Sequence, residues 1–454
     1  MKTLSQISTI MIMMAASVCY SQQWNLVPSP NADPERNLLR GIWANSSNDA
    51  WAVGESGISP SYTLIQHWNG NSWSIINSPS PGTETNVLQE VQGISSDNVY
   101  AVGYTSNNFV PQMLALHWDG SNWTQMSTPT VTGGSSLQSI VIFGPDDIYA
   151  GGLKAVGAPG PTTGTLITHW DGSSWSIEDS PNQSSNRSNY ITSMKGLSSG
   201  DIWASGYSRT IGGTYQNMVL HKTSSGWNLV SVPQPGLENF LYNIDIISSD
   251  NIRIAGQYNN GTQYVPCFLH YNGSTWTVEN SPGGGSGIVH NSGNDIWSSG
   301  SGFVHYDGIS WNTVSAPVPN EGSLVSMSRV SSSDIWAAGR YYEGDIMKTL
   351  IMHYTGSTSI SYQSNTASDY KLYQNYPNPF NPSTNLEFGI SKLGFVTLKV
   401  YDIMGKEVAT LFNSELKPGT YKYKFDASDL AGGTYFYRLS AEDFTETKRM
   451  ILLK

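Results

Sequence analysis

The feature that most constrains this chain is a motif that recurs seven times at intervals of about 50 residues. Each copy contains an alternating apolar stretch, a polar turn, an Asp or Asn, a glycine five residues later, and then a histidine. The Asp or Asn is found at Asp49, Asn98, Asp147, Asp201, Asn251, Asp295 and Asp334. The glycine is found at Gly54, Gly103, Gly152, Gly206, Gly256, Gly300 and Gly339. The histidine is found at His67, His117, His169, His221, His270, His305 and His353, so seven of the eight histidines are one repeated position.

A tryptophan follows six of these histidines at a spacing of six residues, and a proline follows each tryptophan after six more. These tryptophans are Trp73, Trp123, Trp175, Trp227, Trp276 and Trp311. In the seventh copy Ser359 stands at the tryptophan position, whereas Trp24 and Pro30 precede the first copy at the same spacing. We therefore expect the N-terminal strand to complete the last repeat, because closing a ring removes two exposed sheet edges.

Four strands per repeat predict an all-β fold, a seven-bladed β-propeller over residues 22–362 followed by a small Ig-like β-sandwich. The order strand, glycine, loop, aromatic-Asp/Asn-Gly and tryptophan resembles the kelch family. Kelch repeats usually carry two adjacent glycines, and here only Gly151-Gly152 does so. The resemblance implies a ring of similar blades in which the recurring residues are scaffold.

The C-terminal region differs from the body in composition. All 15 tryptophans and all 8 histidines lie at or before His353. From Tyr370 onward there are 11 basic and 9 acidic side chains, against 12 and 25 in the rest of the chain. We place a polar linker at residues 363–371 and a separate domain at 372–454, where alternating apolar stretches predict a small β-sandwich.

This C-terminal region resembles the type A C-terminal sorting domain of type IX secretion substrates from Bacteroidota. The resemblance is carried by Asn375 to Pro382, Tyr401-Asp-Ile-Met-Gly405, Gly419-Thr-Tyr421, Leu430-Ala-Gly-Gly-Thr-Tyr435 and Lys448 to Lys454. The sorting residues it implies are Asn375, Pro377, Asn378, Pro379, Phe380, Asp402, Gly405, Gly433, Tyr435 and Lys454. It further implies handling by the type IX machinery of the outer membrane, with the tail clipped and the body attached to the surface or released. The alternative is a sandwich that only caps the body.

The N-terminus has the order of a secretory signal peptide, which we place at residues 1–21: Lys2, an apolar run from Ile10 to Val18, and small residues ending at Ser21. A lipoprotein anchored through Cys19 is the alternative, although Val18 is unusual before a lipid-modified cysteine. Without Cys19, Cys267 is the one remaining cysteine and no intramolecular disulfide can form. No other apolar run approaches the ~20 residues of a membrane span. We expect an extracellular or outer-membrane surface location.

Residues that recur in every blade are expected to be scaffold, and departures from the repeat are the candidate functional residues. We expect the repeated histidines to hydrogen-bond neighbouring backbone, and the Asp/Asn series to be turn chemistry. The long second-to-third and fourth-to-first connections leave from one face, which we predict to be the binding surface. The candidate ligand-binding residues are Tyr258, Tyr264, Tyr341 and Tyr342 near that face, together with the departures Lys222, Arg253 and His290. Blade six lacks its long loop, since Gly300 and His305 are only five residues apart, and we expect a notch there.

The function that these features favour is a secreted or surface binding protein with a glycan or protein ligand. The alternative is an extracellular propeller glycoside hydrolase or polysaccharide lyase. A net charge of −11 argues against nucleic-acid binding. We identify no catalytic residue, metal-ligand spacing or cofactor motif, and we expect a monomer. Sialidase-like boxes do not match, and a galactose-oxidase-like copper site would need a histidine in the tail. A calcium site without a loop signature stays open.

Overall fold

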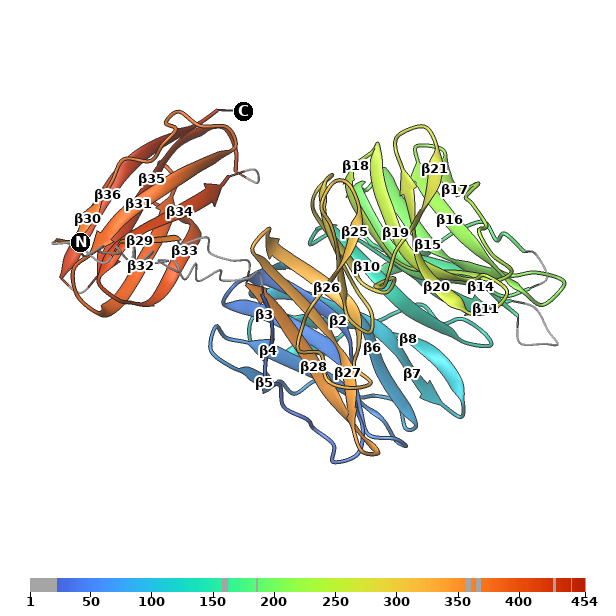
Figure 1. Cartoon of the computed structure of the whole chain (residues 1–454). Helices are drawn as coiled ribbons and strands as arrows, with labels where there is room; N and C mark the ends of the chain where they lie inside the picture. The colour runs from blue at the N-terminus through green and yellow to red at the C-terminus, as the bar shows by residue number, and fades with distance from the viewer. Residues whose placement is uncertain are drawn as a thin grey trace, which may run out of the picture. The chain divides into compact units, whose positions relative to one another are not determined.

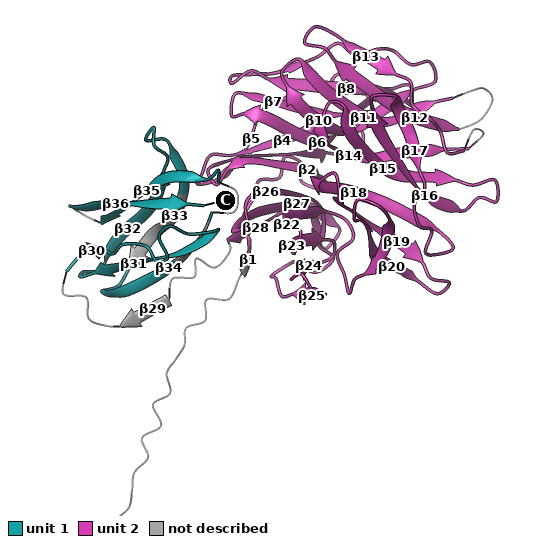
Figure 2. Ribbon diagram, turned by 90° about the horizontal axis from the view of Figure 1, so that it is seen from above, with its two compact units in different colours: residues 1–23, 357–454 teal, residues 24–356 magenta. Residues whose placement is uncertain are grey.

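The computed structural model describes residues 23–156, 162–184, 187–355, 361–364, 369–427, 430–441 and 443–453. These residues form β-strands and connections, without helices. The chain divides into two compact units, one over Trp24–Gly356 and one containing Ser357–Lys454 (Figures 1 and 2). The predicted signal peptide at residues 1–21 and the sorting residue Lys454 lie outside the described residues.

The N-terminal unit consists of seven four-stranded sheets, numbered one to seven in chain order. Sheets one to three contain β2 (Asn37–Ser46), β3 (Asp49–Ser56), β4 (Tyr62–Trp68), β5 (Trp73–Ile75); β6 (Thr85–Ser95), β7 (Asn98–Asn107), β8 (Val110–Trp118), β9 (Trp123–Gln125); and β10 (Ser135–Gly144), β11 (Asp147–Ala155), β12 (Thr163–Trp170), β13 (Trp175–Glu178). Sheets four and five contain β14 (Asn189–Ser198), β15 (Asp201–Arg209), β16 (Tyr215–Thr223), β17 (Gly226–Val230); and β18 (Asn239–Ser248), β19 (Asn251–Asn259), β20 (Tyr264–Tyr271), β21 (Trp276–Asn280). Sheet six contains β22 (Ile288–Ser292), β23 (Asp295–Ser299), β24 (Phe303–Tyr306) and β25 (Trp311–Val314), all short, as the missing loop predicts. Sheet seven contains β26 (Ser323–Ser331), β27 (Asp334–Glu343), β28 (Ile346–Thr355) and, at its edge, β1 (Gln23–Leu26).

The seven sheets form a closed, propeller-like ring. The first strand of each sheet contacts the first strand of the next, and β26 of sheet seven contacts β2 of sheet one. The first strands therefore surround the axis of the ring. At the seam, β1 occupies the sheet edge that the spacing of Trp24 and Pro30 predicts. Trp24 is fully buried there and stacks on Phe303, with ring centroids 3.7 Å apart.

The repeated glycine is explained by a close approach between the first and second strands. A Cβ at Gly54 would lie 1.8 Å from the carbonyl oxygen of Leu38. Equivalent clashes of 1.8–2.3 Å would occur at Gly103, Gly152, Gly206, Gly256 and Gly339. At the same level the first strand carries a bulge, for example between Leu39 and Gly41. Such a bulge leaves one residue unpaired, and here that residue is free to turn toward the axis.

Among the described residues, the repeated histidine side chains bind other side chains and not backbone, so this expectation was wrong. In six sheets the histidine Nε2 lies 2.7–2.9 Å from the side-chain oxygen of the repeated Asp or Asn on the preceding strand. The same histidines stack on the aromatic residue two positions after that Asp or Asn, as His353 does on Trp336 at 3.7 Å. The Asp/Asn series is therefore more than turn chemistry, because it orients a half-buried histidine ring. The sequence did not show this because the partners lie on different strands.

The C-terminal unit consists of two four-stranded sheets that share one apolar core. One has the order β29-β34-β31-β30 and the other β33-β32-β35-β36. Their bounds are β29 (Ser361–Ser364), β30 (Lys371–Leu372), β31 (Ser383–Ile390), β32 (Gly394–Tyr401), β33 (Glu407–Leu416), β34 (Gly419–Asp426), β35 (Gly433–Ala441) and β36 (Phe444–Leu452). Because β29 pairs with β34, residues 361–364 belong to this unit, and the predicted ends of the body at 362 and of the linker at 363–371 need correction.

Candidate functional site

A cavity of 390 Å³ lies where the first strands of the N-terminal unit meet. Each of the seven sheets contributes a residue, mostly from the bulge of its first strand. These residues are Arg40, Gln89, Gln138, Thr192, Tyr242, Ser286 and Val325. Gln257 and Arg340 from second strands, and Leu38, Glu90, Asn243 and Ser326, complete the lining. The cavity is therefore polar, with guanidinium, amide, hydroxyl and phenol groups directed at one space.

One side of the cavity is cationic. Arg40 on β2 and Arg340 on β27 come from adjoining strands of sheets one and seven. The Arg40 Nη2 donates to Glu55 Oε1 at 2.7 Å, and Arg36 Nη2 donates to the same oxygen at 3.0 Å. The Arg40 Nε is buried without a hydrogen-bond partner among the described residues. A fixed guanidinium with a spare donor is suited to an acceptor inside the cavity.

Sheet five contributes a neutral polar side. The Gln257 amide donates to the Tyr242 hydroxyl at 2.7 Å. Burial raises the pKa of Tyr242 to about 12, so its hydroxyl stays neutral and keeps its proton at physiological pH. The Asn243 amide donates to the carbonyl oxygens of Ser286 and Val325, at 2.9 and 3.1 Å, and so ties sheets five, six and seven together. These contacts hold the cavity in shape before any ligand arrives.

Glu90 is the one carboxylate among the described residues that line the cavity. Its Oε2 accepts the backbone N–H of Ile140 in the next sheet at 2.8 Å. At three other contacts between sheets the acceptor of the equivalent backbone N–H is a serine hydroxyl, from Ser139, Ser193 or Ser326. Burial raises the pKa of Glu90, and Lys195 acts in the opposite direction. The carboxylate therefore has a structural role between two sheets.

An aromatic cluster adjoins the cavity at sheets four and five. It consists of Tyr190, Tyr207, Tyr215, Phe240 and Tyr264. Consecutive ring centroids are 4.9–6.0 Å apart. Tyr264 is 45% exposed, and its hydroxyl donates to Glu238. Burial is the main cause that raises the pKa of Tyr242, and the neighbouring Tyr207 and Tyr264 raise it further.

The predicted tyrosines lie near the ends of hairpin strands, and the structure separates them. Tyr258 on β19 and Tyr264 on β20 belong to sheet five, and Tyr264 joins the aromatic cluster. Tyr341 and Tyr342 lie on β27 of sheet seven, where Tyr341 packs against the apolar core. Of the four, Tyr264 is the one in contact with other cluster members. None of the four lines the central cavity.

Lys222 and Arg253 are structural replacements for aromatic residues at contacts between sheets. Elsewhere an aromatic residue of one sheet packs on an aromatic residue of the next, as Trp51 does on Trp118 at 5.1 Å. Lys222 Nζ instead lies 4.0 Å from the Tyr149 ring centroid and pairs with Glu178 at 2.9 Å. Arg253, 2% exposed, lies over Tyr306 at 5.1 Å and pairs with Glu279 at 3.1 Å. Neither lines the cavity, so their role as ligand-binding residues stays a prediction.

His290 also serves an interface between sheets. It is 4% exposed on β22, and both its backbone N–H and its Nδ1 contact Asp245 Oδ2 on β18, at 2.7 and 3.0 Å. Burial tends to raise the pKa of Asp245, but the contact with His290 outweighs it and lowers that pKa. The His290–Asp245 contact is thus a buried link between sheets five and six, outside the cavity lining.

Most of the sorting residues hold the C-terminal unit together. Asn375 is buried, and its side-chain amide donates to the Pro377 carbonyl oxygen at 3.0 Å. Asn378 Oδ1 accepts the backbone N–H of Ile451, and Phe380, also buried, exchanges backbone hydrogen bonds with the last strand. The motif that opens this unit therefore clamps the end of the chain.

The remaining sorting residues form turns and strand ends. Asp402 Oδ1 accepts the backbone N–H groups of Met404 and Lys406, and Gly405 adopts a positive φ of 80°. Gly433 begins β35, and the buried Tyr435 donates its hydroxyl to the Ala431 carbonyl oxygen at 2.7 Å. Pro379 lies between Asn378 and Phe380 in the clamp.

No group of three or more His, Cys, Asp or Glu side chains with the arrangement of a metal site was found among the described residues. Within the same residues, no helix with the length and apolar character of a membrane span was found.

The residues that line the cavity were missed by the sequence analysis. The signal is present but weak: the position after the repeated apolar residue of the first strand is polar in most repeats, as in Arg40, Gln89 and Gln138. Strand alternation alone would direct these residues to the face between sheets. The bulge turns these side chains toward the axis of the ring instead, and the residue types alone do not indicate that a bulge is present.

Comparison with known proteins supports the assignment of the C-terminal unit. Residues 374–453 match the family model described as a secretion system C-terminal sorting domain. The match supports a type IX sorting domain, handling by the type IX secretion machinery, and export to the cell surface or the extracellular space. No curated protein matches the sequence.

Several solved structures are similar to the chain at low identity. A protein of unknown function from Dyadobacter fermentans is 9% identical, with a TM-score of 0.46, and the match covers 74% of this chain and 98% of that one. The polysaccharide lyase Uly1 is 10% identical, with a TM-score of 0.47 and coverage of 70% and 89%. A thermostable family-43 glycoside hydrolase is 10% identical, with a TM-score of 0.35 and coverage of 59% and 98%. At these scores the similarity carries no argument about ligand or reaction.

Proposed function

We propose that this chain is an exported glycan-binding protein. Its body is a kelch-like seven-bladed β-propeller at residues 22–356, and the ligand site is the central cavity with the adjoining aromatic cluster. Its C-terminal unit is an Ig-like type IX sorting domain, and a signal peptide at residues 1–21 supplies the first export step. The mature protein is a monomer on the cell surface or in the extracellular space.

The observation that carries the binding function is the composition of the cavity and its surroundings. Amide, hydroxyl and guanidinium groups from all seven sheets converge on one space, and the aromatic cluster of sheets four and five, with Tyr264 as its exposed member, lies on the strands beside it. Sugars offer hydroxyls that both donate and accept hydrogen bonds, and C–H faces that pack on aromatic rings. A polar pocket beside an aromatic cluster matches both properties.

The cavity favours binding over hydrolysis. Most glycoside hydrolases use a pair of carboxyl groups about 5–9.5 Å apart. Glu90 is the single carboxylate among the described lining residues, and it is engaged with the backbone of Ile140. The glycoside hydrolase alternative therefore lacks a second carboxyl group among the described lining residues.

A glycan array followed by calorimetry tests the binding function on the full chain. Tyr242→Ala in the cavity and Tyr264→Ala in the cluster should each weaken binding at least tenfold. Tyr62→Ala serves as the control, because Tyr62 is a similarly exposed tyrosine at the start of β4 in sheet one. Unchanged affinity in both test variants would refute the assignment of the site. Release of products from the bound glycan would support the hydrolase or lyase alternative.

Export is tested separately by deleting residues 374–453. In a host with a working type IX system, the truncated chain should accumulate in the periplasm, whereas the full chain should reach the surface or the medium. Equal delivery of both forms would show that this unit only caps the body.

A further inference from the structure

We propose that the ligand of the central cavity is an anionic saccharide, whose carboxylate or sulfate group binds between Arg40 and Arg340. This inference rests on the proposed function and names the chemical class of its ligand. The anion is recognised by side chains of sheets one and seven, and the rest of the saccharide extends toward sheet five.

The first step is the placement of two guanidinium groups beside one space. Arg40 and Arg340 both line the cavity, and they come from β2 and β27, which contact each other. Two arginines side by side present several N–H donors in rigid planar geometry, which matches the oxygens of a carboxylate or sulfate.

The second step is the state of those donors. Glu55 holds Arg40 in place through one nitrogen, whereas the Arg40 Nε is buried and has no partner among the described residues. Within the same residues, the Arg340 side chain makes no ion pair or hydrogen bond. Partly buried donors without partners lose hydration and gain nothing in return. An anion in the cavity would satisfy both groups.

The third step is the local charge. Up to residue 369 the chain carries 12 basic and 25 acidic side chains, so a cationic site runs against its overall charge. At this side of the cavity, however, Arg40 and Arg340, with Arg36 behind them, stand against two carboxyl groups: Glu55, which pairs with Arg36 and Arg40, and the lining residue Glu90, which accepts the Ile140 N–H. Three guanidinium groups therefore outnumber the two acids here.

The fourth step is the direction of the rest of the ligand. Tyr242 and Gln257 line the cavity from sheet five, which lies two sheets along the ring from sheet seven and three from sheet one. Phe240 of the aromatic cluster lies two residues before Tyr242 on β18. A saccharide with its anionic unit at the arginines can therefore place a later sugar on the exposed ring of Tyr264.

Calorimetry on the full chain with four probes tests the inference: tetragalacturonate, its methyl ester, a neutral cello-tetrasaccharide and a sulfated galactan tetrasaccharide. At least one anionic probe should bind ten times more tightly than both uncharged ones, since a charge-assisted hydrogen bond is worth about tenfold or more. Preference for tetragalacturonate identifies a carboxylate, and preference for the galactan identifies a sulfate.

Arg340→Gln should abolish the preference for the anionic probe, and Arg340→Lys should restore it in part. Arg187→Gln is the matched control, because Arg187 is an exposed arginine in the connection between β13 and β14 and does not line the cavity. Melting curves of the three variants report whether each is folded. A folded Arg340→Gln variant with full preference would overturn the inference.

Equal binding of neutral and anionic probes would overturn the anionic ligand and leave the glycan-binding function in place. If none of the four probes binds, the anionic ligand is wrong, and the glycan array decides separately whether the proposed function fails as well.

Discussion

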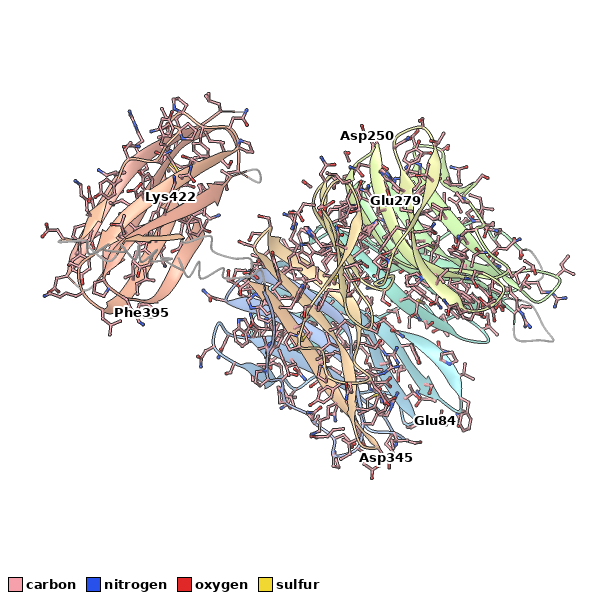
Figure 3. All side chains as sticks on the ribbon, in the orientation of Figure 1. Glu84, Asp250, Glu279, Asp345, Phe395 and Lys422 are labelled. Atoms are coloured by element: carbon pink, nitrogen blue, oxygen red, sulfur yellow. The ribbon has the colours of Figure 1, made fainter. Side chains whose placement is uncertain are left out.

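Replacing Glu279 by Gln should make the stability of the body depend less on pH. Glu279 lies on β21 at the junction of sheets five and six (Figure 3). Its carboxylate accepts two hydrogen bonds from Arg253 at 3.1 Å, lies 3.0 Å from His270 Nδ1, and accepts the indole N–H of Trp311 at 3.2 Å. Glutamine keeps the shape of the side chain and removes its charge.

The expected size follows from the pKa of Glu279. Burial raises this pKa, but the hydrogen bonds from His270 and Arg253 outweigh burial and hold it at about 2, against an ordinary value of 4.5. This difference corresponds to about 3 kcal/mol of folding free energy. Because the folded-state pKa is the lower one, the stabilisation is fully present above pH 4.5 and is lost as the pH falls toward 2. At pH 3 roughly half of it remains.

The assay is denaturant unfolding of the wild type and Glu279→Gln at pH 7 and pH 3. The unfolding free energy of the variant should be lower than that of the wild type by about 3 kcal/mol at pH 7. This difference, called the gap below, should be smaller by about 2 kcal/mol at pH 3. Any cost of leaving Arg253 partly unpaired adds at both pH values, so the change in the gap is the quantity to measure. Asp345→Asn, an exposed carboxylate labelled in the same figure, should leave the gap near zero at both values. A gap for Glu279→Gln that is the same at pH 7 and pH 3 would refute the reasoning.

Three further outcomes are expected. Lys222→Ala should lower the unfolding free energy by about 2 kcal/mol, because it leaves the Glu178 carboxylate without its cation; a melting temperature equal to the wild type would contradict this. Cys267 should react with a thiol reagent only in denaturant, since burial raises its pKa to about 12, and rapid labelling of the folded protein would show the opposite. Trp24→Ala should cost about 3–5 kcal/mol through the cavity left beside Phe303, and a denaturation midpoint unchanged from wild type would argue against β1 as part of the ring.

The sequence predicted the strands of the body well because the repeat states the same information seven times. The Asp/Asn series marks where the second strand of each sheet begins, and the glycine series marks where the first and second strands approach closely. Trp24 located the N-terminal strand at the seam. The strands form an all-β, propeller-like arrangement. The boundary with the C-terminal unit was less accurate, since the short strand at residues 361–364 carries no signal that assigns it to β34.

The candidate site was predicted less well, and for a physical reason. Lys222 and Arg253 looked functional because they break the repeat, but their partners Glu178 and Glu279 break it at a second position, three residues after a tryptophan. A paired change of this kind is a structural substitution, and it becomes visible only when two strands are known to meet. The cavity depends on bulges, which turn Gln138 and its equivalents toward the axis.

The strand at the seam has a consequence for the order in which the chain can acquire its structure. β1 is among the first segments of the body to be synthesised, yet its partner β28 ends about 330 residues later. Until β28 exists, Trp24 has no surface to cover it, and sheet seven has an open edge. The body therefore reaches its final stability in a single late step. In a chain whose synthesis stops before residue 346, β1 stays unpaired and is prone to aggregation.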